Sequence, residues 1–180
     1  MKRLAWALLA LCLLLSGCGR SAAEERYEPF SQALRERHDL CLSAEIRAEY
    51  PDRSVQFLLR YEDDPPGCRV TAEEPAEIRG VTAHLNGAQS ALGYDSVTLD
   101  TGPLDRFGLS PVTALPRLVE ALREGHLDSA WEEDGMTVWS LVPDDGLTVQ
   151  IWLDDGMIPR RAELISQGRV AVFCEIREWK

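Results

Sequence analysis

Several features of enzymes are missing from this 180-residue chain. It has no G-x-S-x-G, S-x-x-K or H-E-x-x-H motif and no phosphate-binding loop, so the common nucleophilic, zinc and nucleotide chemistries leave no signature. His84 and His126 have no obvious partner in the sequence. His38 stands near Cys41, but a loop leading into a strand explains that spacing equally well. We therefore expect no catalytic residues, no metal site and no cofactor.

Basic residues are also scarce. The chain has 19 Lys and Arg against 30 Asp and Glu, which gives a formal net charge of −11. Nucleic-acid phosphates require a basic surface, so a nucleic-acid partner is excluded. The same deficit argues against the body of the protein lying flat on an anionic membrane.

Cysteines with the spacing of metal or redox sites are absent as well. Beyond the first 18 residues only Cys41, Cys68 and Cys174 remain, and none belongs to a C-x-x-C pair. In an oxidising compartment two of them could form a disulfide and leave the third free. Because each sits in a strand-like stretch, we favour the alternative that all three are small, apolar core residues.

The chain has one long apolar run, at residues 4–15, and it is too short to cross a bilayer, which takes about 20 residues. Lys2 and Arg3 precede this run and small residues follow it, the pattern of a secretory signal. The sequence LSGC at 15–18 resembles the lipobox of bacterial lipoproteins. This resemblance implies cleavage between Gly17 and Cys18 and a diacylglyceryl group on the Cys18 Sγ, and two acyl chains anchor a protein stably.

These features predict three parts: a signal peptide at 1–17, a lipidated cysteine with a flexible tether at 18–27, and one folded domain at 28–180. Removing residues 1–17 takes away two basic residues and no acid, so the net charge becomes −13. We expect an extracytoplasmic protein that its lipid anchors to the cell membrane.

Most of the domain alternates apolar and polar residues with the period of half-buried strands. The clearest case is CLSAEIRAEY at 41–50, followed by SVQFLLRYE at 54–62. Asn-Gly, Asp-Gly and Gln-Gly pairs separate many of the strands and favour tight hairpins, so neighbouring strands should be antiparallel. Two Asp-Asp-Gly sequences, ending at Gly146 and Gly156, could suggest calcium. Neither lies in a 12-residue ligand loop, so we expect turns there.

Helical periodicity appears in two places. One helix is expected at 29–37, and a second is expected to begin near 113–115, with Pro116 in its first turn and Gly125 at its end. The second helix would carry an apolar stripe at i, i+3, i+4 and i+7. A long antiparallel sheet with short amphipathic helices on one face is an α+β fold.

With no catalytic motif, the bulky apolar residues of the strands and of the second helix are the remaining candidates for a functional site. They could form an ordinary core, or they could line a hydrophobic cavity for an acyl chain or a partner segment. The candidate cavity residues are Phe57, Leu59, Leu115, Leu118, Val119, Leu122, Trp139 and Trp152.

The order of these elements resembles a known superfamily. PAEIRG at 75–80, GLSP at 108–111 and VQIWLDDGMIPRRAEL at 149–164 are similar to the lipoprotein carriers and anti-sigma regulators typified by LolA, LolB and RseB. The similarity extends to lipid-anchored sporulation and germination lipoproteins of the GerS type. It implies a strongly curved antiparallel half-barrel of about 10 to 11 strands, with short helices over its concave face.

The resemblance also implies a function without catalysis. The domain would bind a hydrophobic ligand, either an acyl chain or a lipoprotein. The alternative is an envelope scaffold or regulator that binds a cell-wall hydrolase or a signalling protein during sporulation or germination. Permanent anchoring departs from the soluble carriers of the superfamily, which shuttle between membranes.

Overall fold

The described part of the protein is built on one open antiparallel sheet. The computed structural model describes residues 21–180 except 51, 88, 103, 105–108 and 145. Its 11 strands follow the order β6-β5-β4-β3-β2-β1-β11-β10-β9-β8-β7. The strands are β1 Cys41–Glu49, β2 Ser54–Asp64, β3 Gly67–Glu74, β4 Thr82–Asn86, β5 Gln89–Tyr94, β6 Val97–Asp100, β7 His126–Glu133, β8 Met136–Asp144, β9 Leu147–Leu153, β10 Pro159–Ser166 and β11 Arg169–Trp179.

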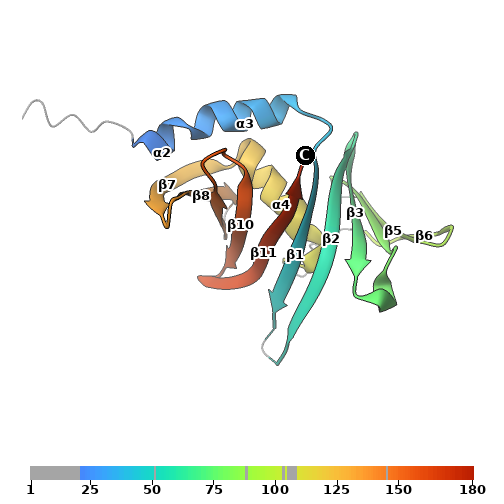
Figure 1. Cartoon of the computed structure of the whole chain (residues 1–180). Coiled ribbons are helices and arrows are strands. Elements are labelled where there is room, and N and C mark those ends of the chain that lie inside the picture. Colours follow the sequence, from blue (N-terminus) through green and yellow to red (C-terminus); the bar gives the residue numbers. More distant parts are fainter. Residues whose placement is uncertain (1–20, 51, 88, 103, 105–108, 145) are drawn as a thin grey trace, which may run out of the picture.

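The sheet consists of two meanders joined in the middle. Strands β1 to β6 form one meander and β7 to β11 the other, and β1 pairs with β11 at the join (Figure 1). The sheet curves strongly and does not close on itself, so β6 and β7 are its two edges. Helix α4 (Pro111–Glu124) connects these edges and crosses the concave face. The predicted α+β half-barrel is thus confirmed.

Strand β1 shows how the sequence sets the faces of the sheet. Leu42, Ala44 and Ile46 have no exposed surface, whereas Glu45 and Arg47 between them are exposed. Successive side chains of a strand point to opposite faces, so the alternation in the sequence becomes a buried concave face and a polar convex face.

Helix α4 begins earlier than the sequence predicted. Its first residue is Pro111, and Ser110 caps it through a reciprocal pair of hydrogen bonds with Thr113. Pro116 therefore lies inside the helix and not in its first turn, where it removes one backbone donor. The strong cap and the apolar face beneath outweigh this loss. Gly125 ends the helix as predicted.

The segment before β1 is more ordered than predicted. Its described part, from Ser21 onward, forms α2 (Ala22–Glu25) and then α3 (Tyr27–Glu36), which starts two residues before the expected helix. Ser21 and Glu24 form a capping box, and Ala23 is buried. The flexible tether predicted at 18–27 therefore does not extend into the described residues.

Three stretches between the regular strands also differ from the prediction. The weakly alternating run EIRGVTAHL at 77–85 predicts a strand, but its first two residues belong to a short 3-10 helix, η1 (Ala76–Ile78). Strands β5 and β7 were not predicted at all. In β7 most residues are half-buried or exposed, so the period of two is weak there and its pairing with β8 holds the strand in place. None of the helices among the described residues is long and apolar enough to cross a membrane.

Candidate functional site

Helix α4 fills the concave face over much of its length. It packs against β8, β10, β1, β2 and β3 and also against α3. The side chains of Leu115, Leu118 and Leu122 are completely buried. Each buried leucine contributes about 1.5–3 kcal/mol by leaving water, so this stripe is part of the hydrophobic core and not the wall of an open cavity.

Trp139 fills the half of the concave face near β7 to β10. It is completely buried, and its Nε1 donates a hydrogen bond to the Ala23 carbonyl at 2.8 Å. The rings of Tyr27 and Phe30 meet it edge-on, with centroids 5.2 and 5.3 Å away. The helices before β1 thus close this half of the barrel.

An open hollow of about 540 Å³ lies on the other half, between α4 and strands β2 to β5. Strands β5 and β6 project past the region that α4 covers (Figure 1). Apolar side chains and the Tyr61 ring form its floor and walls, and charged residues of α4 stand along its rim. The lining residues are Tyr61, Pro66, Gly67, Cys68, Leu85, Gly87, Ser90, Leu104, Thr113, Pro116, Arg117, Val119, Glu120, Arg123 and Glu124.

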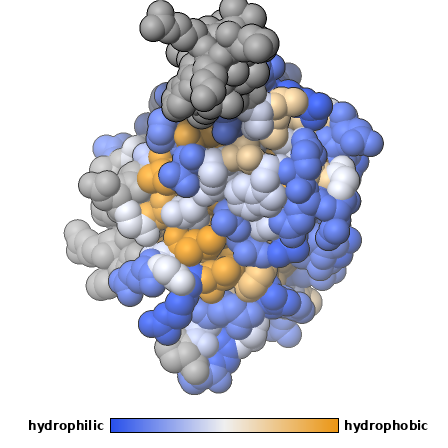
Figure 2. All heavy atoms as spheres, turned by 90° about the vertical axis from the view of Figure 1, so that its left-hand side faces the viewer, coloured by the Kyte–Doolittle hydropathy of each residue, from blue (hydrophilic) through white to orange (hydrophobic). Residues whose placement is uncertain are grey.

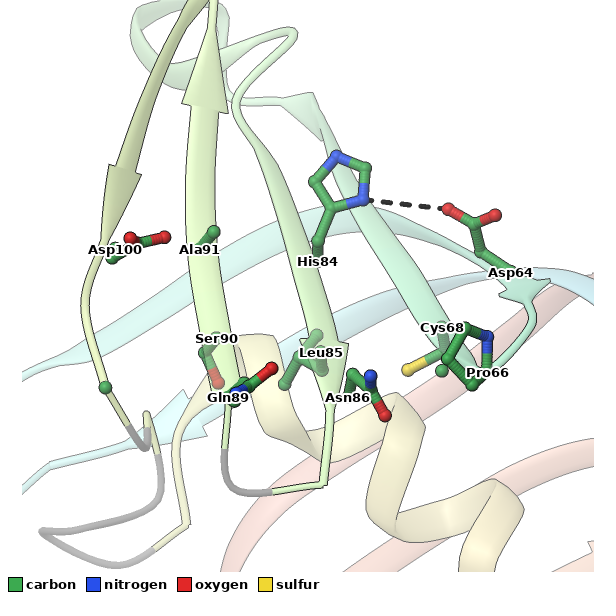
Figure 3. Close-up of a pocket in the computed structure, with 12 residues that line it drawn as sticks. Asp64, Pro66, Cys68, His84, Leu85, Asn86, Gln89, Ser90, Ala91 and Asp100 are labelled. Atoms are coloured by element: carbon green, nitrogen blue, oxygen red, sulfur yellow. Dashed lines mark ion pairs between the residues drawn. The ribbon is translucent and has the colours of Figure 1, made fainter.

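A second hollow of about 500 Å³ adjoins the first at the ends of β3, β4 and β5 (Figure 3). The two share the lining residues Leu85, Ser90 and Cys68 among others. Gly67 allows this wall to be thin, because a Cβ there would lie 2.0 Å from the Leu85 carbonyl oxygen. The two hollows thus lie close together, and the larger one, next to α4, is called the recess below.

The opposite side of the molecule offers a smaller hollow. There the apolar surface forms a band framed by hydrophilic side chains (Figure 2). A smaller hollow of about 380 Å³ lies beside the start of β7, and Tyr27 and Leu127 line it together with Glu24, Glu28 and Asp128. The recess beside α4 has the larger volume and is therefore the better candidate site.

A buried ion pair fixes the C-terminal end of α4 beside the larger hollow. The Arg123 guanidinium donates two hydrogen bonds to the Asp63 carboxylate, at 3.1 and 2.7 Å. Its Nε and Nη2 also donate to the Leu34 and Arg37 carbonyls, which ties α3 to the same point. The side chain of Asp63 is only 6% exposed, so the pair is shielded from water.

The same contacts determine the charge of Asp63. Burial alone would raise its pKa, but hydrogen bonds from Arg123, Tyr61 and the Leu40 backbone favour the carboxylate and hold that pKa below its ordinary value. Burial and the bond to Asp63 raise the pKa of Tyr61, which remains a phenol and donates at 2.7 Å. The site is therefore negatively charged at Asp63 and neutral at Tyr61 at pH 7.

We expect Asp63→Asn to lower the free energy of unfolding at pH 7 by about 2–3 kcal/mol, because it leaves the Arg123 charge unpaired in a largely buried position. The depressed pKa of Asp63 stabilises the fold above the ordinary Asp pKa of about 3.9, and this contribution is lost as the pH falls through the folded value. Urea unfolding at pH 7 and pH 3 should show the difference shrinking in acid. Asp39→Asn, which changes an 84% exposed partner of Arg37, is the control and should unfold like the wild type. Equal stability of Asp63→Asn and wild type at pH 7 would contradict the assignment.

The structure separates the residues that the sequence proposed for a cavity. Leu59, Leu115, Leu118, Leu122 and Trp139 belong to the filled core, with Phe57 packed partly buried against it. Only Val119 also lines the hollow.

Trp152 does not belong to this group. It follows Ile151 of the buried face in β9, so it points to the convex side, where the Arg161 guanidinium lies 4.3 Å from its ring centre. The hollow depends instead on Leu85 and Ser90, which face each other across β4 and β5. Ser90 is polar and the β5 periodicity is weak, so nothing in the sequence marked this pair.

The cysteines and histidines are dispersed. Cys41, Cys68 and Cys174 are all free thiols. Burial raises the pKa of Cys68 to about 11 and that of Cys174 to about 12, so both are protonated at pH 7. His84 lies 3.6 Å from Asp64, with both side chains about half exposed.

Metal ligands do not converge either. Within the described ranges, no three His, Cys, Asp or Glu side chains are arranged to hold a metal ion. In the second Asp-Asp-Gly sequence, Asp154 accepts hydrogen bonds from the Gly156 and Ile158 backbone and pairs with Arg160. That carboxylate stabilises the turn, as the sequence predicted. Cys18 and Gly17 lie outside the described residues, so the lipidation and cleavage sites remain predictions.

These elements define an open, curved antiparallel half-barrel plugged by helices. No family model and no curated protein matches the chain. Solved structures do match along most of their length. A putative outer membrane lipoprotein-sorting protein domain from Vibrio parahaemolyticus is 12% identical and has a TM-score of 0.49, with 88% of this chain and 92% of that chain covered.

Two further structures are similar to the chain at comparable levels. The LolA superfamily protein NE2245 from Nitrosomonas europaea is 14% identical over 89% of this chain and 94% of its own, with a TM-score of 0.43. A chain in the complex of the CwlD amidase with the GerS lipoprotein from Clostridioides difficile is 12% identical over 90% of this chain and 97% of its own, with a TM-score of 0.45. All three structures have TM-scores below 0.5. At such identities they concern the fold alone and say nothing about ligand or partner.

Proposed function

We propose that this protein is a membrane-anchored extracytoplasmic lipoprotein whose half-barrel binds one hydrocarbon chain in the recess beside α4. The observation that carries the proposal is the hollow of about 540 Å³ between α4 and β2 to β5. Its size falls within the roughly 300–1,000 Å³ of small-ligand sites. The role is one of binding, without catalysis.

The chemistry of the recess supports an amphipathic ligand. Leu85, Leu104 and Val119 offer apolar contacts, and each buried methylene of a ligand would contribute about 0.8 kcal/mol. Arg117 and Glu120 form an ion pair at 2.9 Å along the rim. A hydrocarbon chain could lie inside while its polar head stays at this charged margin.

The sequence supports the anchor, and the start of α2 limits how far Cys18 can lie from the domain. Only Gly19 and Arg20 separate Cys18 from Ser21, the cap of α2. Three residue steps span at most about 10 Å. A lipid on Cys18 would therefore hold the α2 end of the domain close to the membrane.

The test is a titration of the protein lacking residues 1–20, which keeps every described element, with a fluorescent fatty-acid analogue. Saturable binding with one ligand per chain is the expected result. A linear, unsaturable signal would contradict the proposal. The alternative inferred from the resemblance, a scaffold for a cell-wall hydrolase or signalling protein in sporulation or germination, instead requires a protein-binding surface.

A further inference from the structure

The outer strand β6 carries an exposed apolar face. Tyr94 is 58% exposed, Val97 69% and Leu99 64%, and in the described part of the chain these are three of the five exposed large apolar residues. Tyr94 pairs with Val97, and Leu92 with Leu99, so the four side chains share one face of the β5–β6 hairpin. A contiguous group of exposed, large apolar side chains is uncommon on a protein surface and often marks a binding site.

The hairpin is held in a defined shape. Asp95 and Ser96 both have positive φ, 44° and 67°, which is the geometry of a two-residue turn that matches the twist of the strands. At the other end of β6 the Thr101 backbone donates to the Ser90 carbonyl at 3.0 Å. The apolar face is therefore presented on a preformed element.

Among the described residues no strand pairs with the outer side of β6, because β6 is the last strand of the sheet. A two-residue turn makes Tyr94 and Val97 a hydrogen-bonded pair, and the pattern alternates along an antiparallel ladder. Thr98 is thus the first residue whose N–H and C=O point away from β5. An edge of this kind can accept a further strand.

The charge around β6 indicates what kind of strand fits. Between Gly80 and Gly102 the sequence has no Lys or Arg, Asp95 lies in the turn before β6, and Asp100 is the last residue of β6. A segment with basic residues would complement these carboxylates. A second copy of this chain would bring the same acidic hairpin and a net charge of −11, and an anionic membrane would be repelled in the same way.

We propose that β6 is a docking edge for an extended protein segment of alternating apolar and basic residues, which adds to the sheet as a further strand. Backbone hydrogen bonds from Thr98 supply the affinity, and the apolar face around Val97 and Leu99 and the two aspartates supply the selectivity. The inference does not depend on hydrocarbon binding, because the docking edge lies outside the recess.

The test uses the full chain in phosphatidylcholine nanodiscs and a fluorescent nine-residue peptide of alternating valine and lysine, followed by polarisation. Wild type should bind this peptide but not the same peptide N-methylated at alternate residues, which keeps its charge. Thr98→Pro removes the outward N–H and should weaken binding about tenfold, the order expected for one or two lost hydrogen bonds. Thr98→Val keeps the backbone donor and should bind like the wild type.

Each competing occupant has its own signature. Equal binding of the N-methylated peptide, or wild-type affinity in Thr98→Pro, would overturn the proposal. Dimers that Thr98→Pro dissociates would assign β6 to a second copy of the chain. Binding of the fluorescent fatty acid should be unchanged in Thr98→Pro, so failure of the docking edge can be told from failure of the recess.

Discussion

Replacing Cys18 with serine is expected to abolish metabolic labelling of the protein by a fatty-acid probe and to release its domain from the membrane fraction. A diacylglyceryl group can be attached only to the thiol, and the serine hydroxyl at the same position is not a substitute. The prediction follows from LSGC at 15–18 after a short apolar run. Because two acyl chains give stable anchoring, we expect the effect to be complete.

Cys12→Ser is the matched control. Cys12 lies inside the apolar run that cleavage would remove, so this variant should be labelled and membrane-bound like the wild type. Equal labelling of Cys18→Ser and the wild type would contradict the anchor. That result would not bear on the fold of the described residues, which begin at Ser21.

Replacing Ser90 with phenylalanine is expected to weaken fatty-acid binding by about tenfold or more, the effect of losing about two buried methylenes at about 0.8 kcal/mol each. Ser90 is 7% exposed and lines both hollows opposite Leu85. An aromatic ring at this position would occupy the space that the ligand needs. The measurement is the same titration that tests the proposed function.

Ser90→Ala controls for the loss of the hydroxyl, because it leaves the hollow open and should keep the affinity of the wild type. Thermal unfolding of both variants shows whether the added ring disturbs the fold. Wild-type affinity in a folded Ser90→Phe protein would place the ligand elsewhere.

The sheet was largely predictable because the apolar and polar residues of its central strands alternate, and this alternation shows which side chains face the core. In β1 and β2 every second residue is apolar, and Leu59 and Tyr61 are buried as that pattern requires. Strand β5 escaped prediction because its side chains are buried unevenly and Gly93 interrupts the pattern. Pairing with β4 and β6 holds it in the sheet, and such long-range pairing cannot be read from local periodicity.

The start of α4 was missed for a different reason. Pro116 argued for a late start, whereas Ser110 and Thr113 form a cap that places the first turn at Pro111. The cap could have been read from Ser-Pro-x-Thr, although Thr is not the usual partner at that position.

The candidate site was the least predictable part. An apolar helical stripe such as Leu115, Leu118 and Leu122 looks the same in a sequence whether it faces a core or a cavity. The outcome depends on how far α4 reaches across the sheet and on how Trp139 fills the other half. The recess appears where β4 and β5 extend beyond the helix, which is a property of the whole fold.

The central claim, a hydrocarbon chain in the recess beside α4, is tested most directly by photo-crosslinking. A fatty acid with a diazirine on its chain is irradiated with the protein, and the adducts are located by mass spectrometry. The account predicts adducts at Leu85, Ser90, Leu104 and Val119, which line the larger hollow, and their loss with excess unlabelled fatty acid. Adducts scattered over the convex face, for example at Trp152, or no competed adduct at all, would contradict it.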